Sequence, residues 1–227
     1  MTASETETTN GPERRYYQLV FIWLRDADKF RRYLELARPV VERYGGALER
    51  MLLPEAIHAE GMTRPDIINV VHYESREAFA ALGQDPDFAR VVHLRSESID
   101  MAAVDGRPVG GTLTHRELDR RVYLVELACY GREGATGYHD YDAEAGPFME
   151  RHGWHLERAL SPDSASGLSF APDVVKVAYF DSREAQAAMQ GDPAHHRIEK
   201  HLYPAAVARS IWVTARVHPA TLAPSGA

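Results

Sequence analysis

Two ionisable residues stand in apolar runs where charged side chains are seldom found. Glu126 lies within residues 123–130 and Lys176 within residues 174–180. An unpaired buried charge is costly, so such groups pair or change their pKa. If the two runs are adjacent strands, the carboxylate and the ammonium can meet, and we expect Glu126 and Lys176 to be catalytic, as a general base and a substrate-anchoring cation. The alternative is a structural ion pair, because such pairs also perturb pKa values.

Five further side chains are candidates for substrate binding. Tyr33 and Tyr141 take the same inward position in two similar helical patterns, where each phenol could hydrogen-bond a carbonyl or hydroxyl group. Asn69, His72 and Tyr179 lie in or at the end of apolar runs. Each also has a simpler explanation, since a tyrosine on an amphipathic helix packs with its tip exposed, and a lone histidine at a strand end is commonly a rim residue.

The remaining histidines do not have the spacing of a metal site. His195, His196 and His201 share one segment, but none of their separations is the i, i+4 spacing of a helical metal pair. His58 is explained as a rim residue, and His152 by its place near a helix C-terminus. Phosphate-binding loops, nucleophile elbows and dinucleotide fingerprints are also absent. We predict no metal and no cofactor, although nothing in the residues excludes haem or flavin.

Composition and charge exclude several classes of partner. The chain has 227 residues, 44% of them hydrophobic, and a formal net charge of −7. Because its basic residues are scattered, we expect no nucleic-acid partner and no membrane docking. No apolar run approaches the ~20 residues that span a bilayer, and residues 1–13 lack the apolar core of a signal peptide. With Cys129 as the only cysteine, we expect a soluble cytoplasmic protein without intrachain disulfides.

The chain repeats three sequence blocks in one order at nearly one offset, which indicates an internal duplication. In this alignment Val20 corresponds to Glu126 and Asn69 to Lys176. The matching blocks are ERYGGALER at 42–50 with ERHGWHLER at 150–158, PDIINVVHYESREAFAAL at 65–82 with PDVVKVAYFDSREAQAAM at 172–189, and Asp-Pro at 85–86 with Asp-Pro at 192–193.

Periodicity predicts the same elements in each half. Ser75 and Ser182 are typical helix N-caps, and each Asp-Pro pair is typical of the start of a further helix. In the first half, a helix follows from Phe30 to Tyr44 and ends at Gly45-Gly46. The strands expected there cover 16–24, 47–53, 66–73 and 99–104. Each half therefore reads β-α-β-β-α-β, the ferredoxin-like pattern of the α+β class.

Such a sheet carries helices on one face and leaves the other face bare and apolar. We expect the two sheets to cover each other as an intramolecular pseudo-dimer with a barrel-like core, with further homodimerisation left open. The predicted organisation is disordered tails at 1–14 and 219–227, units at 15–108 and 121–218, and a linker at 109–120, which overlaps the Gly- and Pro-rich stretch 106–119.

These blocks resemble the dimeric α+β barrel superfamily. The resemblance covers nearly all of residues 16–107 and is looser over 121–218, where Gly153-Trp154 replaces the paired glycines. It points to an uncharacterised domain family related to the NIPSNAP and antibiotic-biosynthesis-monooxygenase families. It implies a small-molecule pocket between sheet and helices in each unit, in proteins as different as cofactor-free oxygenases, cyclases, isomerases, haem proteins and stress-response proteins.

From these observations we expect a tailoring enzyme of secondary metabolism that acts on an aromatic or polyketide-like substrate. It would be a cofactor-independent oxygenase, a cyclase or an isomerase. The alternative is a non-catalytic ligand-binding or stress-response protein. Because ionisable substitutions occur only in the second half, we expect the more polar pocket there, lined by Glu126, Tyr141, Lys176 and Tyr179.

Overall fold

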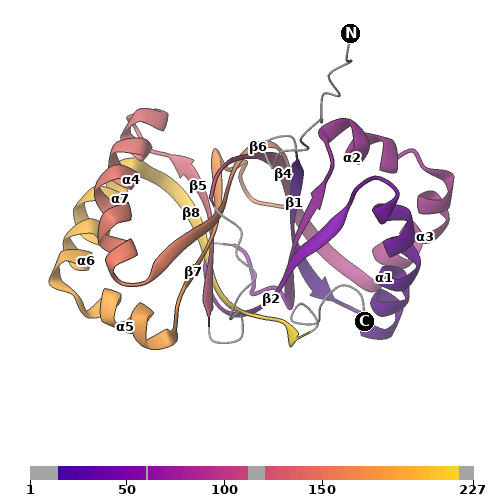
Figure 1. Cartoon of the computed structure of the whole chain (residues 1–227), viewed down its shortest axis with the longest axis horizontal. Helices are drawn as coiled ribbons and strands as arrows, with labels where there is room; N and C mark the ends of the chain where they lie inside the picture. The colour runs from indigo at the N-terminus through magenta and orange to yellow at the C-terminus, as the bar shows by residue number, and fades with distance from the viewer. Residues whose placement is uncertain (1–14, 60, 112–120, 220–227) are drawn as a thin grey trace, which may run out of the picture.

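The computed structural model describes residues 15–59, 61–111 and 121–219. Within them, eight antiparallel strands form one closed barrel in the order β1-β3-β2-β8-β5-β7-β6-β4, and two layers of helices flank it on opposite sides (Figure 1). The strands are β1 (Tyr16–Leu24), β2 (Ala47–His58), β3 (Ile67–Tyr73), β4 (Ile99–Gly110), β5 (Val122–Tyr130), β6 (Trp154–Ser166), β7 (Val174–Phe180) and β8 (Val207–Val217). The helices are α1 (Ala27–Glu42), α2 (Arg76–Leu82), α3 (Pro86–Ser98), α4 (Gly134–Arg151), α5 (Arg183–Gly191), α6 (Pro193–Arg197), the π-helix η3 (Ile198–Leu202) and α7 (Tyr203–Ala206).

The barrel is closed by pairing between the two halves of the chain. Strands of the first half lie together in the order β4-β1-β3-β2, and those of the second half in the order β8-β5-β7-β6. Their outer strands hydrogen-bond across the seam, β2 with β8 and β4 with β6. The expected barrel-like core is confirmed, and the edge pairing leaves no strand of the described barrel with an open edge.

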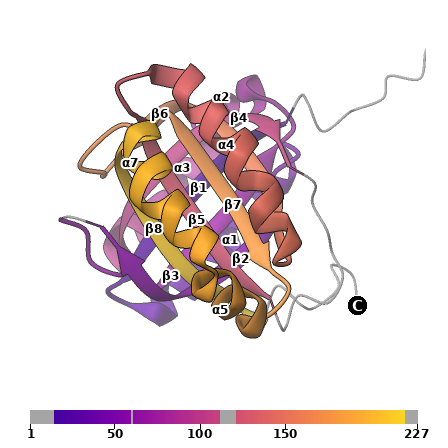
Figure 2. The same ribbon diagram turned by 90° about the vertical axis from the view of Figure 1, so that its left-hand side faces the viewer.

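Each central strand is buried on both faces, which explains its continuous apolar sequence. In β1, Tyr17, Leu19 and Phe21 point into the barrel, whereas Val20 and Ile22 pack beneath the helices. The second half repeats this division. Figure 2 shows α4 and the α6–η3–α7 segment lying across the outer face of the second-half strands. Among the described residues, no helix is both long and apolar enough to cross a bilayer.

The predicted starts of α2, α3, α5 and α6 are confirmed by capping contacts, whereas α1 begins at Ala27, earlier than the predicted Phe30. The side chains of Ser75 and Ser182 accept hydrogen bonds from backbone N–H groups in the first turns of α2 and α5. Asp85 and Asp192 do the same for α3 and α6, each just before a proline. Gly45, with φ of +63°, lies just beyond α1, in the left-handed conformation that other residues adopt at a cost.

Two strands extend further than the sequence pattern indicates. The strand expected over 47–53 continues to His58, through an irregularity between Pro54 and Ala56. The last strand of the first half continues past 104 to Gly110, because residues 103–110 pair with β6. The prediction that the linker stretch begins at 106, and the first unit ends at 108, is therefore too early. Residues 112–120 and the predicted tails 1–14 and 220–227 lie outside the described residues.

The repeated Leu-Glu-Arg sequence forms reciprocal ion pairs inside the barrel. Arg50 Nη2 lies 2.6 Å from Glu157 Oε1, and Arg158 Nη2 lies 3.2 Å from Glu49 Oε2. All four residues are buried. Each glutamate also accepts a hydrogen bond from a tyrosine of its own half: Tyr17 donates to Glu49, and Tyr123 donates to Glu157. Each half therefore supplies the acid for the other half's arginine.

Candidate functional site

Glu126 and Lys176 lie on the helix-covered face of the second-half sheet. The two residues are direct partners in the β5–β7 ladder, so their side chains leave the sheet on the same side. Their neighbours Val125 and Val177 point into the barrel. The prediction that the two strands are adjacent and that the two side chains share a face is confirmed. The charges lie beneath α4 and not inside the barrel.

Lys176 forms its ion pair with a residue that the sequence pattern did not single out. Its Nζ lies 2.5 Å from Oδ1 of Asp142, on α4, and 4.7 Å from the ring centre of Tyr138. The side chain of Asp142 is 31% exposed, whereas that of Lys176 is 8% exposed. The lysine therefore reaches from the buried sheet toward the accessible edge of the helical layer, in the manner of a snorkelling side chain.

Glu126 is held by two phenols in place of an ion pair. Tyr138 donates to Oε2 and Tyr203 donates to Oε1, each at 3.2 Å. Glu126 is only 4% exposed. Burial raises its pKa to about 7, and Asp142 adds to the rise, while Lys176 and the two phenols oppose it. A carboxyl group in this state exchanges a proton near neutral pH, which an ordinary glutamate does not.

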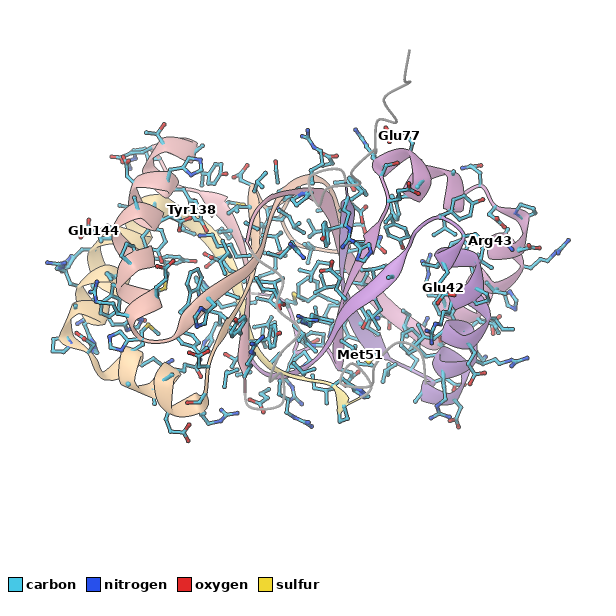
Figure 3. All side chains as sticks on the ribbon, in the orientation of Figure 1. Glu42, Arg43, Met51, Glu77, Tyr138 and Glu144 are labelled. Atoms are coloured by element: carbon cyan, nitrogen blue, oxygen red, sulfur yellow. The ribbon has the colours of Figure 1, made fainter. Side chains whose placement is uncertain are left out.

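An aromatic cluster surrounds this carboxyl group. Ring centres of Tyr138 and Tyr141 lie 5.9 Å apart, and those of Tyr141 and Tyr203 lie 5.5 Å apart in an edge-on arrangement. Trp212, the partner of Glu126 on β8, donates from Nε1 to the Tyr203 hydroxyl at 2.7 Å. Burial, followed by the negative charge of Glu126, raises the pKa of all three phenols. In Figure 3, Tyr138 is labelled on the second-half side of the barrel.

A π-helical turn brings Tyr203 to the carboxyl group. The Tyr203 N–H bonds to the carbonyl of Ile198, five residues earlier, within η3. The α6, η3 and α7 segments contain five, five and four residues, one more than the 13 residues of α3 at the same place in the first half. Pro204 contributes, because it has no N–H to donate to an i−4 carbonyl. Single π-turns of this kind occur often at functional sites.

Of the remaining predicted site residues, one lies in this cluster, and the others lie inside the barrel or in the layer beneath the first-half helices. Tyr141 is part of the aromatic cluster, but Tyr179 is on the opposite face of β7 and points into the barrel. There it stacks on His155 at 5.0 Å and lies 3.9 Å from the Arg121 guanidinium. The expectation that Tyr179 lines the pocket with Glu126 is wrong, because strand alternation places odd and even positions of β7 on different faces.

His72 also points into the barrel, with Nδ1 at 3.0 Å from Oε1 of Glu49. Burial opposes the ionisation of Glu49, but His72, Arg158 and Tyr17 together lower its pKa to about 2. This histidine therefore belongs to the charged cluster at the seam between the halves. Tyr33 is on the buried face of α1 in the first half, against Phe30 of the same helix. Asn69 is buried in the middle of β3 and faces the same layer, because its two neighbours in the strand point into the barrel.

The sequence pattern missed Tyr138, Asp142, Tyr203 and Trp212. A signal was present on α4, where Tyr138, Tyr141 and Asp142 have the i, i+3, i+4 spacing of one helix face. For Tyr203 the only signal in the sequence was that the α6–η3–α7 segment is one residue longer than α3, the corresponding helix of the first half. In the part of the chain that the structure describes, no three His, Cys, Asp or Glu side chains gather as metal ligands.

Comparison with known proteins supports the fold. Residues 16–106 match the model of a family described as "Domain of unknown function (DUF1330)". No curated protein matches the chain. An anthrone oxidase-like protein has a TM-score of 0.57 at 14% identity, covering 91% of this chain and 92% of that chain. A chlorite dismutase variant from Candidatus Nitrospira defluvii has a TM-score of 0.58 at 10% identity, covering 92% and 94%.

A third structure, a Lactobacillus acidophilus protein provisionally named a monooxygenase, has a TM-score of 0.51 at 9% identity and covers 90% of this chain and 94% of that chain. At these identities the likeness shows the fold alone. The mixed α+β fold, an eight-stranded antiparallel barrel, is that of the dimeric α+β barrel proteins, as the sequence blocks indicate.

Proposed function

We propose that the second half binds a small molecule between its sheet and α4–α7, and that Glu126 takes a proton from it. The observation that carries this proposal is a buried carboxyl group with a pKa near 7 inside a cluster of phenols. General bases are most effective when their pKa lies near the working pH. Burial is the main cause of the raised pKa of Glu126, and the negative charge of Asp142 adds to it.

The surroundings define the substrate class. The Tyr138, Tyr141 and Tyr203 rings favour a flat aromatic or polyketide-like molecule. Ionised Glu126 breaks an acidic C–H or O–H bond of the substrate and keeps the proton, while the electron pair remains on the substrate as an enolate or phenolate. Lys176 lies beside Glu126 on the adjacent strand, where its positive charge favours that anion.

Three outcomes of this step are open to the anion: reprotonation at another carbon, ring closure onto a carbonyl group, or reaction with molecular oxygen. The names of the similar structures, an anthrone oxidase-like protein and a provisional monooxygenase, favour the reaction with oxygen. We therefore place the protein among the oxygenase-type enzymes that act without a cofactor, in the cytoplasm and in secondary metabolism.

Non-catalytic ligand binding is the second candidate, and one observation favours it. The polar groups of the cluster already satisfy one another: Lys176 is paired with Asp142, and both Glu126 oxygens accept hydrogen bonds from phenols. A cluster whose polar groups are already paired in this way can form the wall of a binding site without transferring a proton.

The test uses anthrone, an enolisable tricyclic ketone. Wild-type protein should accelerate deuterium exchange at the acidic CH₂ group of anthrone under argon and oxygen uptake in air. Glu126→Gln should lose about 10²- to 10⁴-fold of the exchange rate. Glu144→Gln, the same change at an exposed position of α4, serves as the matched control. Binding of anthrone without accelerated exchange would support the non-catalytic function, and exchange that survives Glu126→Gln would contradict the assigned base.

We also infer that the two halves are tandem copies of one ferredoxin-like unit, with kinship to the NIPSNAP and antibiotic-biosynthesis-monooxygenase families. The same element order in each half and the reciprocal pairs Arg50–Glu157 and Arg158–Glu49 support this. Such reciprocal contacts are typical of a two-fold interface. The chain would then act as a pseudo-dimer, with a small molecule as its partner and no nucleic acid or membrane.

A further inference from the structure

The loop that joins β2 to β3 and the loop that joins β6 to β7 meet at one end of the barrel and enclose a cavity. Its volume is about 180 Å³, and it is lined by residues 61–63, residues 167–169 and Trp23 near the end of β1. None of these residues belongs to a helix, and Trp23, Met62 and Leu168 pack against the core inside the barrel. The cavity is therefore separate from both helical layers, and each half of the chain supplies one of its loops.

A glycine allows the loop of the second half to reach this place. Gly167 has a φ of +69°, and a Cβ atom there would lie 2.7 Å from the carbonyl oxygen of Met101 and 3.0 Å from Cα of Ala102. Only glycine adopts this conformation at such a short distance from the β4 backbone without strain. The close approach brings Leu168 and Ser169 of the second half to the cavity that Trp23 lines from the first half.

Two arginines hold the loops in position. Arg64 Nη1 donates to the carbonyl of Pro54 at 3.1 Å, and Arg209 donates to the carbonyl and the hydroxyl of Ser169 at 3.3 and 3.1 Å. The Arg209 guanidinium also lies 4.9 Å from the ring centre of Phe170. Loops that are already held by such contacts lose less conformational freedom when a ligand binds, which favours binding.

The lining determines the polarity of the ligand. The Trp23 indole N–H donates to the carbonyl of Thr63 at 3.3 Å, so the indole presents its ring to the cavity. The Ser169 hydroxyl accepts from Arg209 and retains its own proton for donation. None of the lining residues in the described part of the chain is charged. An ion would lose water here without gaining a counter-charge, so an uncharged ligand is favoured.

The volume determines the size of the ligand. An apolar cavity of about 150 Å³ in a protein holds one benzene molecule. A cavity of about 180 Å³ therefore accommodates a single ring with a small substituent. The apolar side chains of Met62 and Leu168 suit the ring, because a thioether makes favourable contacts with aromatic groups.

We propose that this cavity binds an uncharged, single-ring aromatic carbonyl compound. The ring lies against Trp23, Met62 and Leu168, and the carbonyl oxygen accepts a hydrogen bond from the Ser169 hydroxyl. The site depends on both halves of the chain, because each supplies one loop. It does not depend on the function proposed for Glu126, which lies beneath α4.

Acetophenone and ethylbenzene test this site, because they share a ring and a two-carbon substituent but only acetophenone has an acceptor. The chain has three tryptophans, and Trp154 and Trp212 both lie in the second half. In ¹⁵N-labelled full-length protein, both probes should shift the indole N–H signal of Trp23. Ser169→Ala removes the donor, so it should weaken acetophenone binding by about three- to tenfold and leave ethylbenzene binding unchanged.

Ser166→Ala is the matched control, since it makes the same change at an exposed position three residues earlier that does not line the cavity. It should bind both probes as the wild type does. The proposal is overturned if neither probe shifts Trp23, if Ser169→Ala weakens both probes equally or neither, or if Ser166→Ala reproduces its effect. Acetophenone that shifts Trp212 and not Trp23 would occupy the second-half site, which would overturn this proposal and leave the one for Glu126 standing.

Discussion

At the scale of single residues, the second-half cluster contains two carboxyl groups and one lysine, and only one of the carboxyl groups forms an ion pair with it. Lys176 has two carboxyl groups within its layer and pairs with Asp142, the more exposed of the two. Glu126, deeper in the layer, is left with phenols and takes up a proton at a pH where glutamates are normally ionised. The depth of each carboxyl group decides its role, because desolvation penalises the charged form of the deeper group more.

The first prediction concerns this proton. Because the folded-state pKa of Glu126 is raised from 4.5 to about 7, the unfolded chain ionises first as the pH rises through that range. Wild-type stability should then fall relative to Glu126→Gln by about 3 kcal/mol between about pH 4.5 and pH 7, and the difference should be constant above and below. Urea unfolding over this pH range measures it.

Glu144→Gln is the control for that measurement, since it makes the same change at a side chain that is about half exposed on α4, the helix that covers Glu126. A difference between wild type and Glu126→Gln that stays constant from about pH 4 to pH 8 would show that the pKa of Glu126 is the same in the folded and the unfolded chain, so that burial does not raise it.

At the scale of elements, the π-turn η3 is the feature by which the helical layer of the second half differs from that of the first half. The first-half helix α3 spans 13 residues without interruption, and the second-half segment accommodates one more residue by widening one turn. The widened turn leads directly into Tyr203, whose hydroxyl bonds Glu126 and accepts from Trp212. One inserted residue therefore changes which side chain reaches the sheet.

The second prediction follows from this geometry. Deleting Glu199, an exposed residue of η3, should restore a regular α-helix and turn Tyr203 away from Glu126, because successive α-helical residues are rotated by about 100°. The Trp212 indole would then lose its Tyr203 acceptor, and tryptophan fluorescence should change. Glu199→Ala, which keeps the residue count, should leave the fluorescence as in the wild type. An unchanged spectrum in the deletion variant would mean that the π-turn does not position Tyr203.

At the scale of the whole molecule, the two halves are joined by hydrogen-bonded strands at two seams and by charges inside the barrel. The four charges of Glu49, Arg50, Glu157 and Arg158 are buried, so each depends on its partner from the other half. Removing one member of a buried pair is far more damaging than removing both, because a single removal leaves an uncompensated charge.

The third prediction tests this dependence. Arg50→Met should lower the free energy of unfolding by about 3–5 kcal/mol, and the double variant Arg50→Met, Glu157→Leu should recover much of that loss. Arg38→Met provides the comparison, since its pair with Glu42 on α1 is exposed and should contribute less than about 1 kcal/mol. Urea unfolding monitored by circular dichroism measures all three. Equal stability of the Arg50 single and double variants would show that the pairs do not couple the halves.

Much of this molecule is determined by sequence periodicity alone. Apolar alternation and capping residues such as Ser75 and Asp85 specify the order of the elements and most of their boundaries, because these are local interactions. The same local rules place Glu126 and Lys176 on buried strands. Alternation along β7 would also have separated Lys176 from Tyr179, since the two positions differ by an odd number of residues.

Only the tertiary structure decided what each of these side chains meets. Periodicity shows that residues share a face, but it does not show which element covers that face. Three kinds of contact join residues that are distant in the chain. They are the Lys176–Asp142 ion pair, the hydrogen bond from Tyr203 to Glu126, and the ion pairs of Arg50 and Arg158 with glutamates of the other half. These contacts depend on how helices and seams pack in space, and packing is the property of the closed barrel as a whole.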